Sequence, residues 1–192
     1  MYRRALEIFE KVHGEDHPDV ATSLNNLAEL LRAQGKLAEA EPMLRRALAI
    51  YENALGENHP SVAISLNNLA GLLEAQNKLD EAEPMYRRAL AIKKNALGEN
   101  HPSVAISLNN LAMLLKAQNK LDEAEPMLRR ALEIAKNALG EDHPSVALSL
   151  NNLAELLRAQ GKLAEAEPML RRALAIDKNA LGENHPLSLI HI

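Results

Sequence analysis

The side chains with the most regular spacing are pairs of adjacent asparagines, which recur every 42 residues along the chain. An asparagine side chain offers one acceptor oxygen and two N–H donors, which match the hydrogen-bonding groups of a peptide backbone whatever its side chains. The eight members are Asn25, Asn26, Asn67, Asn68, Asn109, Asn110, Asn151 and Asn152. A ladder of this kind could bind another polypeptide. Two other interpretations stay open, namely that the asparagines bond to neighbouring helices, or that they are identical because the copies duplicated recently.

Residue types that support catalysis or metal binding are missing or badly spaced. The sequence contains no cysteine, which excludes disulfides, thiolate metal sites and cysteine nucleophiles. One histidine in each 42-residue step does not bring two or three imidazoles to one metal ion, so we interpret these histidines as helix caps. No Gly-rich phosphate loop and no Ser/His/Asp arrangement interrupts the repeat. We therefore expect no enzymatic activity, no metal and no cofactor.

Charge and hydropathy exclude two further classes of partner. The 22 basic and 26 acidic residues give a net charge of −4, which does not favour nucleic acid. The double arginines are each preceded by glutamates, and Glu83 lies four residues before Arg87, the favourable order for a helix ion pair. No apolar run approaches the roughly 18 residues that would span a bilayer, and the N-terminus lacks the apolar stretch of a signal peptide. We expect a cytoplasmic protein that binds neither nucleic acid nor membrane.

The period of the chain is set by the dipeptide His-Pro, which begins at His17, His59, His101, His143 and His185. Of the 42 positions in a copy, 31 are identical in all four full copies. The divisions predicted from this period are residues 1–16 (second helix of a preceding repeat), 17–58, 59–100, 101–142 and 143–184 (four repeats), and 185–192 (start of a next repeat or a non-native tail). We therefore expect a fragment of a longer bacterial or metagenomic protein.

Each copy is predicted to form two helices. In the second copy, Pro60 suits the first position of a helix that continues to about Gln76, because its missing N–H has no helical partner there. A second helix is expected from about Leu79 to Leu97, with Pro84 bending its first turn and a glycine in a left-handed cap ending it. One such pair cannot bury its apolar stripe, but stacked copies can. The fold class expected is therefore all-α, a right-handed α-solenoid of helix hairpins.

These residues resemble a known family. Leu66, Leu69, Ala70, Leu73, Ala82, Tyr86 and Ala89 follow the spacing of the tetratricopeptide (TPR) signature. The 42-residue length and the strings LNNLA, EAEPMYRRAL and ALGENHP resemble the TPR arrays of kinesin light chains. The resemblance implies a concave groove, lined by the first helices, that binds a peptide segment of a protein partner.

The variable positions of the first helix all lie opposite its predicted packing face, apart from the one at its start. At about 100° per residue, Ile64, Asn67, Asn68 and Glu74 fall on the side opposite Leu66 and Leu73. Variation confined to one exposed face is what a binding surface that differs between copies would give. The predicted peptide-binding residues are the eight asparagines together with Glu29, Arg32, Ile64, Glu74, Ile106, Met113, Lys116, Glu155 and Arg158.

Three functional hypotheses follow. The first is a protein-interaction module that binds a peptide in the groove. The second is a structural spacer, or an array that associates end to end through helix faces left open at the two ends of the stack. The third is a regulatory or sensor portion of a larger signalling protein.

Overall fold

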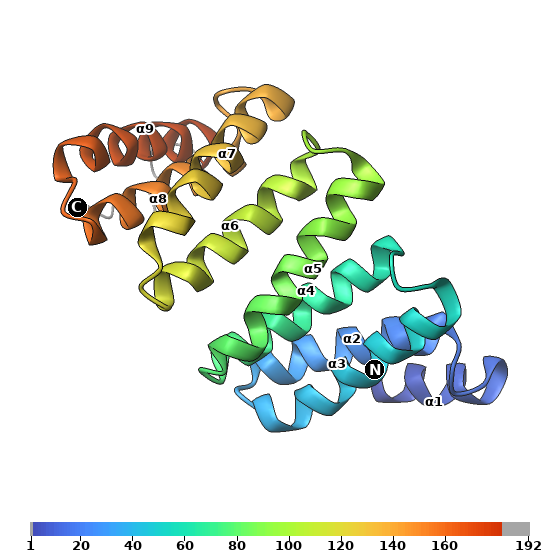
Figure 1. Ribbon diagram of the computed structural model, residues 1–192. Helices are drawn as coiled ribbons and strands as arrows, with labels where there is room; N and C mark the ends of the chain where they lie inside the picture. Colours follow the sequence, from blue (N-terminus) through green and yellow to red (C-terminus); the bar gives the residue numbers. More distant parts are fainter. Residues whose placement is uncertain (1, 182–192) are drawn as a thin grey trace. The chain divides into compact units, whose positions relative to one another are not determined.

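The structure is a computed structural model that describes residues 2–181. The tail expected at 185–192 lies outside the described residues. Within the described range the chain contains nine helices and no strand (Figure 1). Their bounds are α1 Tyr2–His13, α2 Pro18–Ala33, α3 Leu37–Leu55, α4 Pro60–Ala75, α5 Leu79–Leu97, α6 Pro102–Ala117, α7 Leu121–Leu139, α8 Pro144–Ala159 and α9 Leu163–Leu181. The helix pair predicted for the second copy is therefore confirmed, to within one residue at the end of α4.

The first helix of every copy begins at a histidine cap, as predicted. His59 lies just before α4 in an extended conformation, and its Nδ1 accepts a hydrogen bond of 3.1 Å from the Ser61 backbone N–H. His17, His101 and His143 cap α2, α6 and α8 in the same way. The proline that follows each histidine occupies the first helical position, where no backbone donor is required.

The second helix of each copy continues through its internal proline, and α3, α5 and α7 each end before a glycine. Pro42 and Pro126 lie near the starts of α3 and α7, and neither divides its helix. Gly56 and Gly140 follow the two helices with φ of 88° and 89° and ψ of 152° and 156°. This is not the left-handed helical cap that the sequence predicts, but an extended positive-φ conformation that is open almost only to glycine.

The chain divides into two compact units, Met1–Ala96 and Leu97–Ile192. In the first unit, α2, α3, α4 and α5 share one apolar core that includes Val20, Ile50, Leu66 and Ile92, and Phe9 of α1 packs against it. Helices of neighbouring copies therefore bury their apolar stripes against one another, as expected for a repeat architecture.

The second unit is built in the same way. Ala135 of α7, Val146 and Leu150 of α8, and Ile176 of α9 form a common apolar core. Leucine and alanine dominate both cores, and every layer repeats the same close packing. The outward sides of the first helices carry exposed residues, among them Ile64 in the first unit and Ile106 in the second.

Candidate functional site

Each unit carries one surface formed by the outward sides of its two complete first helices. We call these the α2–α4 surface and the α6–α8 surface. Within each unit the two first helices pack against each other. The α2–α4 surface comprises Thr22, Asn26, Glu29, Arg32, Ile64, Asn68, Gly71 and Glu74. The α6–α8 surface comprises Ile106, Asn110, Met113, Lys116, Leu148, Asn152, Glu155 and Arg158.

The apolar members of these surfaces are exposed, as the helix geometry predicts. Ile64, Ile106 and Leu148 keep 54%, 53% and 56% of their surface in contact with solvent. The positions one residue later in the chain are Ser65, Ser107 and Ser149, and these serines are buried. The exposed aliphatic side chains are thus placed on the outside by the helix register, where they offer apolar area to a partner.

The two asparagines of a pair lie in different environments, and this corrects the expectation that all of them face a groove. Asn25 and Asn109 are buried, with 7% and 6% of their surface exposed. Ser65 Oγ of α4 donates a hydrogen bond of 3.3 Å to Asn25 Oδ1 of α2. Asn109 Nδ2 of α6 donates one of 3.1 Å to Ser149 Oγ of α8. The expectation is wrong for Asn25 and Asn109, which join neighbouring first helices.

The second asparagine of each pair stays nearer the solvent. Asn26 is exposed, and Asn68, Asn110 and Asn152 are half-buried. Asn152 Nδ2 donates to Asn109 Oδ1 at 3.3 Å. Asn67 and Asn151, the first members of the other two pairs, are also half-buried. Six of the eight asparagines therefore keep part of their surface exposed, and Asn26 is the most open of them.

The α2–α4 surface is dominated by hydrogen-bonding and charged groups. Tyr86 of α5 donates its hydroxyl proton to Glu74 Oε2 at 3.1 Å. Burial, together with the neighbouring Glu74 carboxylate, raises the pKa of Tyr86 above its usual value. A β-carbon on Gly71 would lie 3.2 Å from Arg32 Nη1 and 3.3 Å from the Tyr86 hydroxyl oxygen, so the missing side chain leaves room for both groups. Arg32 also lies 3.5 Å from Glu29 Oε1.

The α6–α8 surface is more apolar at the corresponding positions. Met113, which is half-buried, stands where the second copy has Gly71, and the same surface carries the exposed Ile106 and Leu148. Two charged residues of the α6–α8 surface pair between helices: Lys116 Nζ of α6 lies 2.7 Å from Glu155 Oε2 of α8. The two surfaces thus share a helical framework and differ in the side chains they present.

The role of the tyrosines was missed by sequence reasoning, although a signal was present. Tyr86 occupies a position that is leucine in the other three copies, and it occurs in the copy that also has Gly71 and Glu74. Tyr51 likewise occurs at its position in one copy, the copy that has Thr22. The hydroxyl oxygens of Tyr51 and Thr22 are 2.8 Å apart. Departures from the repeat that occur together in one copy would have predicted both contacts.

Sequence reasoning also missed a set of ion pairs between copies. These ion pairs join the second helix of one copy to the helix pair of the next copy. The predicted pairing of a glutamate with the arginine four residues later is confirmed, for example between Glu125 and Arg129. The next copy then adds two contacts, from Lys162 Nζ to Glu125 Oε2 at 2.8 Å and from Arg129 Nη2 to Glu165 Oε2 at 3.2 Å. These cations lower the pKa of Glu125 to about 2. We call this four-residue arrangement the charge clamp.

The first unit contains the same charge clamp. Lys78 Nζ lies 2.8 Å from Glu41 Oε2, and Arg45 Nη2 lies 3.2 Å from Glu81 Oε2. The pKa of Glu41 is lowered to about 2, chiefly by Lys78 and then by Arg45. The double arginines are therefore engaged with carboxylates rather than arranged to meet phosphate groups.

Among the described residues, no group of three or more histidine or acidic side chains could hold a metal ion. In the same part of the chain, no helix is both long enough and apolar enough to cross a membrane. What both surfaces can do chemically is hydrogen-bond, pair charges and bury aliphatic side chains.

Comparison with known proteins agrees with this geometry. A model of the tetratricopeptide repeat matches residues 1–53, 23–95, 62–137, 103–179 and 145–190. The chain belongs to the tetratricopeptide repeat family. Its fold is accordingly an all-α TPR solenoid, a type of scaffold used in protein interaction. A search of the curated proteins found no match.

Solved structures with the same fold include kinesin light chain-like repeat proteins. The nearly identical TPR-like repeats of a Podosopora anserina protein assigned as a kinesin light chain are 29% identical, with a TM-score of 0.77, over 94% of this TPR chain and 86% of that one. BtubC (BKLC) from P. vanneervenii is 30% identical, with a TM-score of 0.83, over 96% of this chain and 73% of that one. Aspartyl phosphate phosphatase F from Bacillus subtilis, at 16% identity and a TM-score of 0.78 over 94% and 45% of the two chains, shares the fold alone.

Proposed function

We propose that this TPR chain is a non-enzymatic interaction module whose α2–α4 and α6–α8 surfaces bind a peptide segment of a protein partner. One observation carries the proposal. Positions on the packing side of the first helices are identical in every copy, whereas Ile64, Gly71 and Glu74 and their counterparts vary on the outward side. Positions that packing does not constrain are free to vary, but three of the four copies also keep an exposed aliphatic residue on this side, which is typical of a contact surface.

The peptide would be held by two kinds of contact. The second asparagines, Asn26 and Asn68 in the first unit, offer amide donors and acceptors to its main chain. Ile106 and Leu148 in the second unit offer exposed apolar area to one of its side chains. Main-chain contacts of this type tolerate many sequences, so selectivity would come from the variable positions.

The net charge of each surface would decide which peptide sequences it prefers. On the α2–α4 surface, Glu29 and Glu74 outnumber Arg32 by one charge. On the α6–α8 surface, Lys116 and Arg158 outnumber Glu155 by one charge. The first surface would favour a basic stretch and the second an acidic stretch that includes an aliphatic residue.

The test begins with a peptide selected from a random library displayed against the whole chain. Its affinity is measured by calorimetry on the parent chain and on the double variant Asn26→Ala with Asn68→Ala. Each lost hydrogen bond should cost about 0.5–1.5 kcal/mol, so the double variant should bind about fivefold more weakly, or worse. The expected cost to stability is small, because neither asparagine is buried.

The matched control is Asn53→Ala with Asn95→Ala, two asparagines that are exposed near the ends of α3 and α5. This control should bind the peptide as the parent does. If the two double variants keep equal affinity for the peptide, the second asparagines do not contact it and the proposal fails.

A further inference from the structure

One position of the second helices differs in all four copies, and no other of the 42 positions in the repeat does so. It holds Tyr51 in the first copy, Lys93 in the second, Ala135 in the third and Asp177 in the fourth. The four side chains end in a hydroxyl, an ammonium, a methyl and a carboxylate group. This position is therefore more varied than any position on the outward sides of the first helices.

In the first copy this position reaches the outward side of the first helix. The Tyr51 hydroxyl oxygen lies 2.8 Å from Oγ1 of Thr22, which is an exposed member of the α2–α4 surface. The counterpart of Thr22 in the second copy is Ile64. A lysine side chain is about as long as a tyrosine side chain, so Lys93 can bring its ammonium group beside Ile64. An aliphatic group there cannot bond to the ammonium as the threonine hydroxyl bonds to Tyr51.

The ammonium group of Lys93 lacks a partner among the described residues. Lys93 is half-buried, and it forms no hydrogen bond or ion pair with them. Burial lowers the pKa of its ammonium group, and no neighbouring charge contributes to the change. A partly buried cation without a partner costs free energy, which an anion on a ligand would offset.

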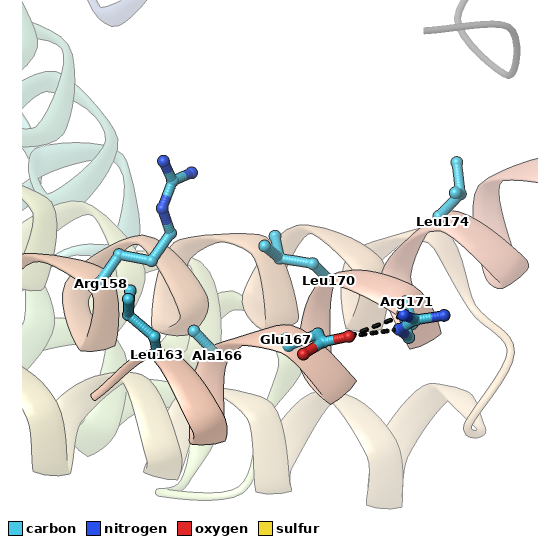
Figure 2. A pocket seen from close by; sticks show the side chains of 7 residues that line it. All are labelled: Arg158, Leu163, Ala166, Glu167, Leu170, Arg171 and Leu174. Atoms are coloured by element: carbon cyan, nitrogen blue, oxygen red, sulfur yellow. Dashed lines mark hydrogen bonds and ion pairs between the residues drawn. The ribbon is translucent and has the colours of Figure 1, made fainter. Parts of the chain in front are cut away.

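The arginines of the second helices differ from Lys93 in this respect. Each of the eight arginines of α3, α5, α7 and α9 forms an ion pair with a carboxylate of the described chain. Even Arg171, which borders an open hollow of about 520 Å³ on α9, bonds to Glu167 at 2.7 Å (Figure 2). Lys93 is therefore half-buried like many of its neighbours but is not neutralised as these arginines are.

We propose that the position of Tyr51 and Lys93 determines which peptides this chain selects, and that Lys93 binds a carboxylate side chain of the peptide beside Ile64. The inference rests on the proposed function, because it adds a second-helix residue to the α2–α4 surface. Each copy would then combine a similar first helix with a different group from its second helix. The ligand class that Lys93 selects is a peptide with an aspartate or glutamate at the matching place.

Lys93 and the carboxylates of the α2–α4 surface act on different parts of such a peptide. Ile64 and Glu74 are ten residues apart on α4, which corresponds to about 15 Å along the helix axis. An acidic residue bound beside Ile64 and a basic residue bound near Glu74 can therefore belong to the same peptide. Opposite charges at the two places would also disfavour a peptide that carries its charges in the reverse order.

The test is a selection that measures specificity directly. Random peptides displayed on phage are selected separately against the parent chain, Lys93→Glu and Lys94→Glu, and the enriched sequences are compared. Peptides selected by the parent should share an acidic residue at one aligned place, and those selected by Lys93→Glu should have lysine or arginine there. Lys94→Glu is the matched control and should select the same peptides as the parent. The counterpart of Lys94 is Glu52, which pairs with Arg88 of the next second helix and not with a first helix.

Calorimetry with one synthetic peptide selected by the parent gives the size of the effect. At low salt, Lys93→Glu should weaken its binding about tenfold and Lys93→Met about threefold, because the first variant adds repulsion to the lost attraction. Replacing the acidic residue of the peptide by lysine should restore its affinity for the Lys93→Glu chain. Lys93→Met keeps an unbranched apolar side chain and removes a partly buried charge, so this variant should fold as the parent does.

Two results would overturn this inference alone. The parent and Lys93→Glu could select peptides with the same charges, or Lys93→Met could bind the selected peptide as tightly as the parent does. In either case, weaker binding by the double variant Asn26→Ala with Asn68→Ala would leave the proposed function in place. A third result, in which none of the chains enriches any peptide, would overturn both the proposed function and the role of Lys93.

Discussion

The α2–α4 and α6–α8 surfaces are built on first helices of almost the same sequence, yet they offer a ligand different chemistry. On the first, Tyr86 and Arg32 fill the space left by Gly71, and Tyr51 bonds to Thr22. On the second, the apolar residues are Met113, Ile106 and Leu148, and Lys116 pairs with Glu155. A repeat array can therefore keep its packing side constant and change its outward side at three or four positions per copy.

The largest expected effect on peptide affinity concerns the exposed aliphatic residues of the α6–α8 surface. Ile106→Glu should weaken binding of a selected peptide about tenfold, whereas Ile64→Glu should weaken it about threefold, because Ile106 shares its surface with Met113 and Leu148, and Ile64 shares its surface with Thr22 and Gly71. The two isoleucines are equally exposed, at 53% and 54%, so neither change should alter the free energy of unfolding by more than about 0.5 kcal/mol. Calorimetry gives the affinities. Equal losses would mean that the two surfaces contribute alike.

The next effect separates buried from exposed asparagines. Asn109→Ala should lower the free energy of unfolding by about 2 kcal/mol, because Ser149 loses a buried partner and Asn152 loses a half-buried one. Asn25→Ala should cost about 1 kcal/mol, since Ser65 alone loses a partner. Asn26→Ala, one residue further along the helix, should cost less than about 0.5 kcal/mol. Urea denaturation followed by circular dichroism measures all three, and a similar cost for Asn26 and Asn25 would contradict the account.

A smaller effect is confined to the first unit. Tyr86→Phe removes the hydroxyl that donates to Glu74 and should lower the free energy of unfolding by about 1 kcal/mol. Because burial raises the pKa of Tyr86, its ultraviolet titration should occur at higher pH than that of a free tyrosine, and this late step should vanish in the variant. Leu128→Met, at the corresponding position of the second unit, serves as the control and should leave the titration unchanged.

The smallest effect should be shared by both units, since each has a charge clamp. The folded pKa values of Glu41 and Glu125, about 2, lie below the unfolded value of about 4.3. The stability that these carboxylates contribute is therefore present above pH 4.3 and is lost as the pH falls toward 2. Glu41→Gln and Glu125→Gln should each reduce that acid-dependent loss of stability by an amount between a few tenths of a kcal/mol and about 1 kcal/mol. Urea midpoints measured from pH 5 to pH 2 test this, and unchanged slopes in both variants would speak against the clamps.

Much of the fold could be predicted from the sequence because local chemistry determines it. Proline holds the preceding histidine in an extended conformation and itself suits the first position of a helix, so His-Pro followed by an apolar stripe of helical period indicates a helix start. The nitrogen that caps α4 belongs to that same histidine. A period of 42 residues with a constant apolar stripe leaves stacked hairpins as the way to bury that stripe. These features depend on neighbours in sequence, which are visible without coordinates.

The environment of the asparagines could not be predicted in the same way. A helical wheel places Asn67 and Asn68 on opposite borders of the outward side, at about 300° and 40°, and does not show which border meets the next first helix. That depends on how two copies stack, which turns the first asparagine toward a serine about 40 residues later. The tyrosine contacts and the charge clamp also join residues from different helices, and they became apparent only when the copies were placed side by side.

The central claim is tested most directly by trapping the bound peptide on the surface itself. The chain has no cysteine, so Ile106→Cys, Leu148→Cys and the control Ala138→Cys, exposed near the end of α7, each introduce one thiol. A selected peptide that carries a single cysteine is then allowed to form mixed disulfides, and the captured fraction is measured by mass spectrometry. The account predicts capture at positions 106 and 148 well above that at 138, while equal capture at all three would contradict it.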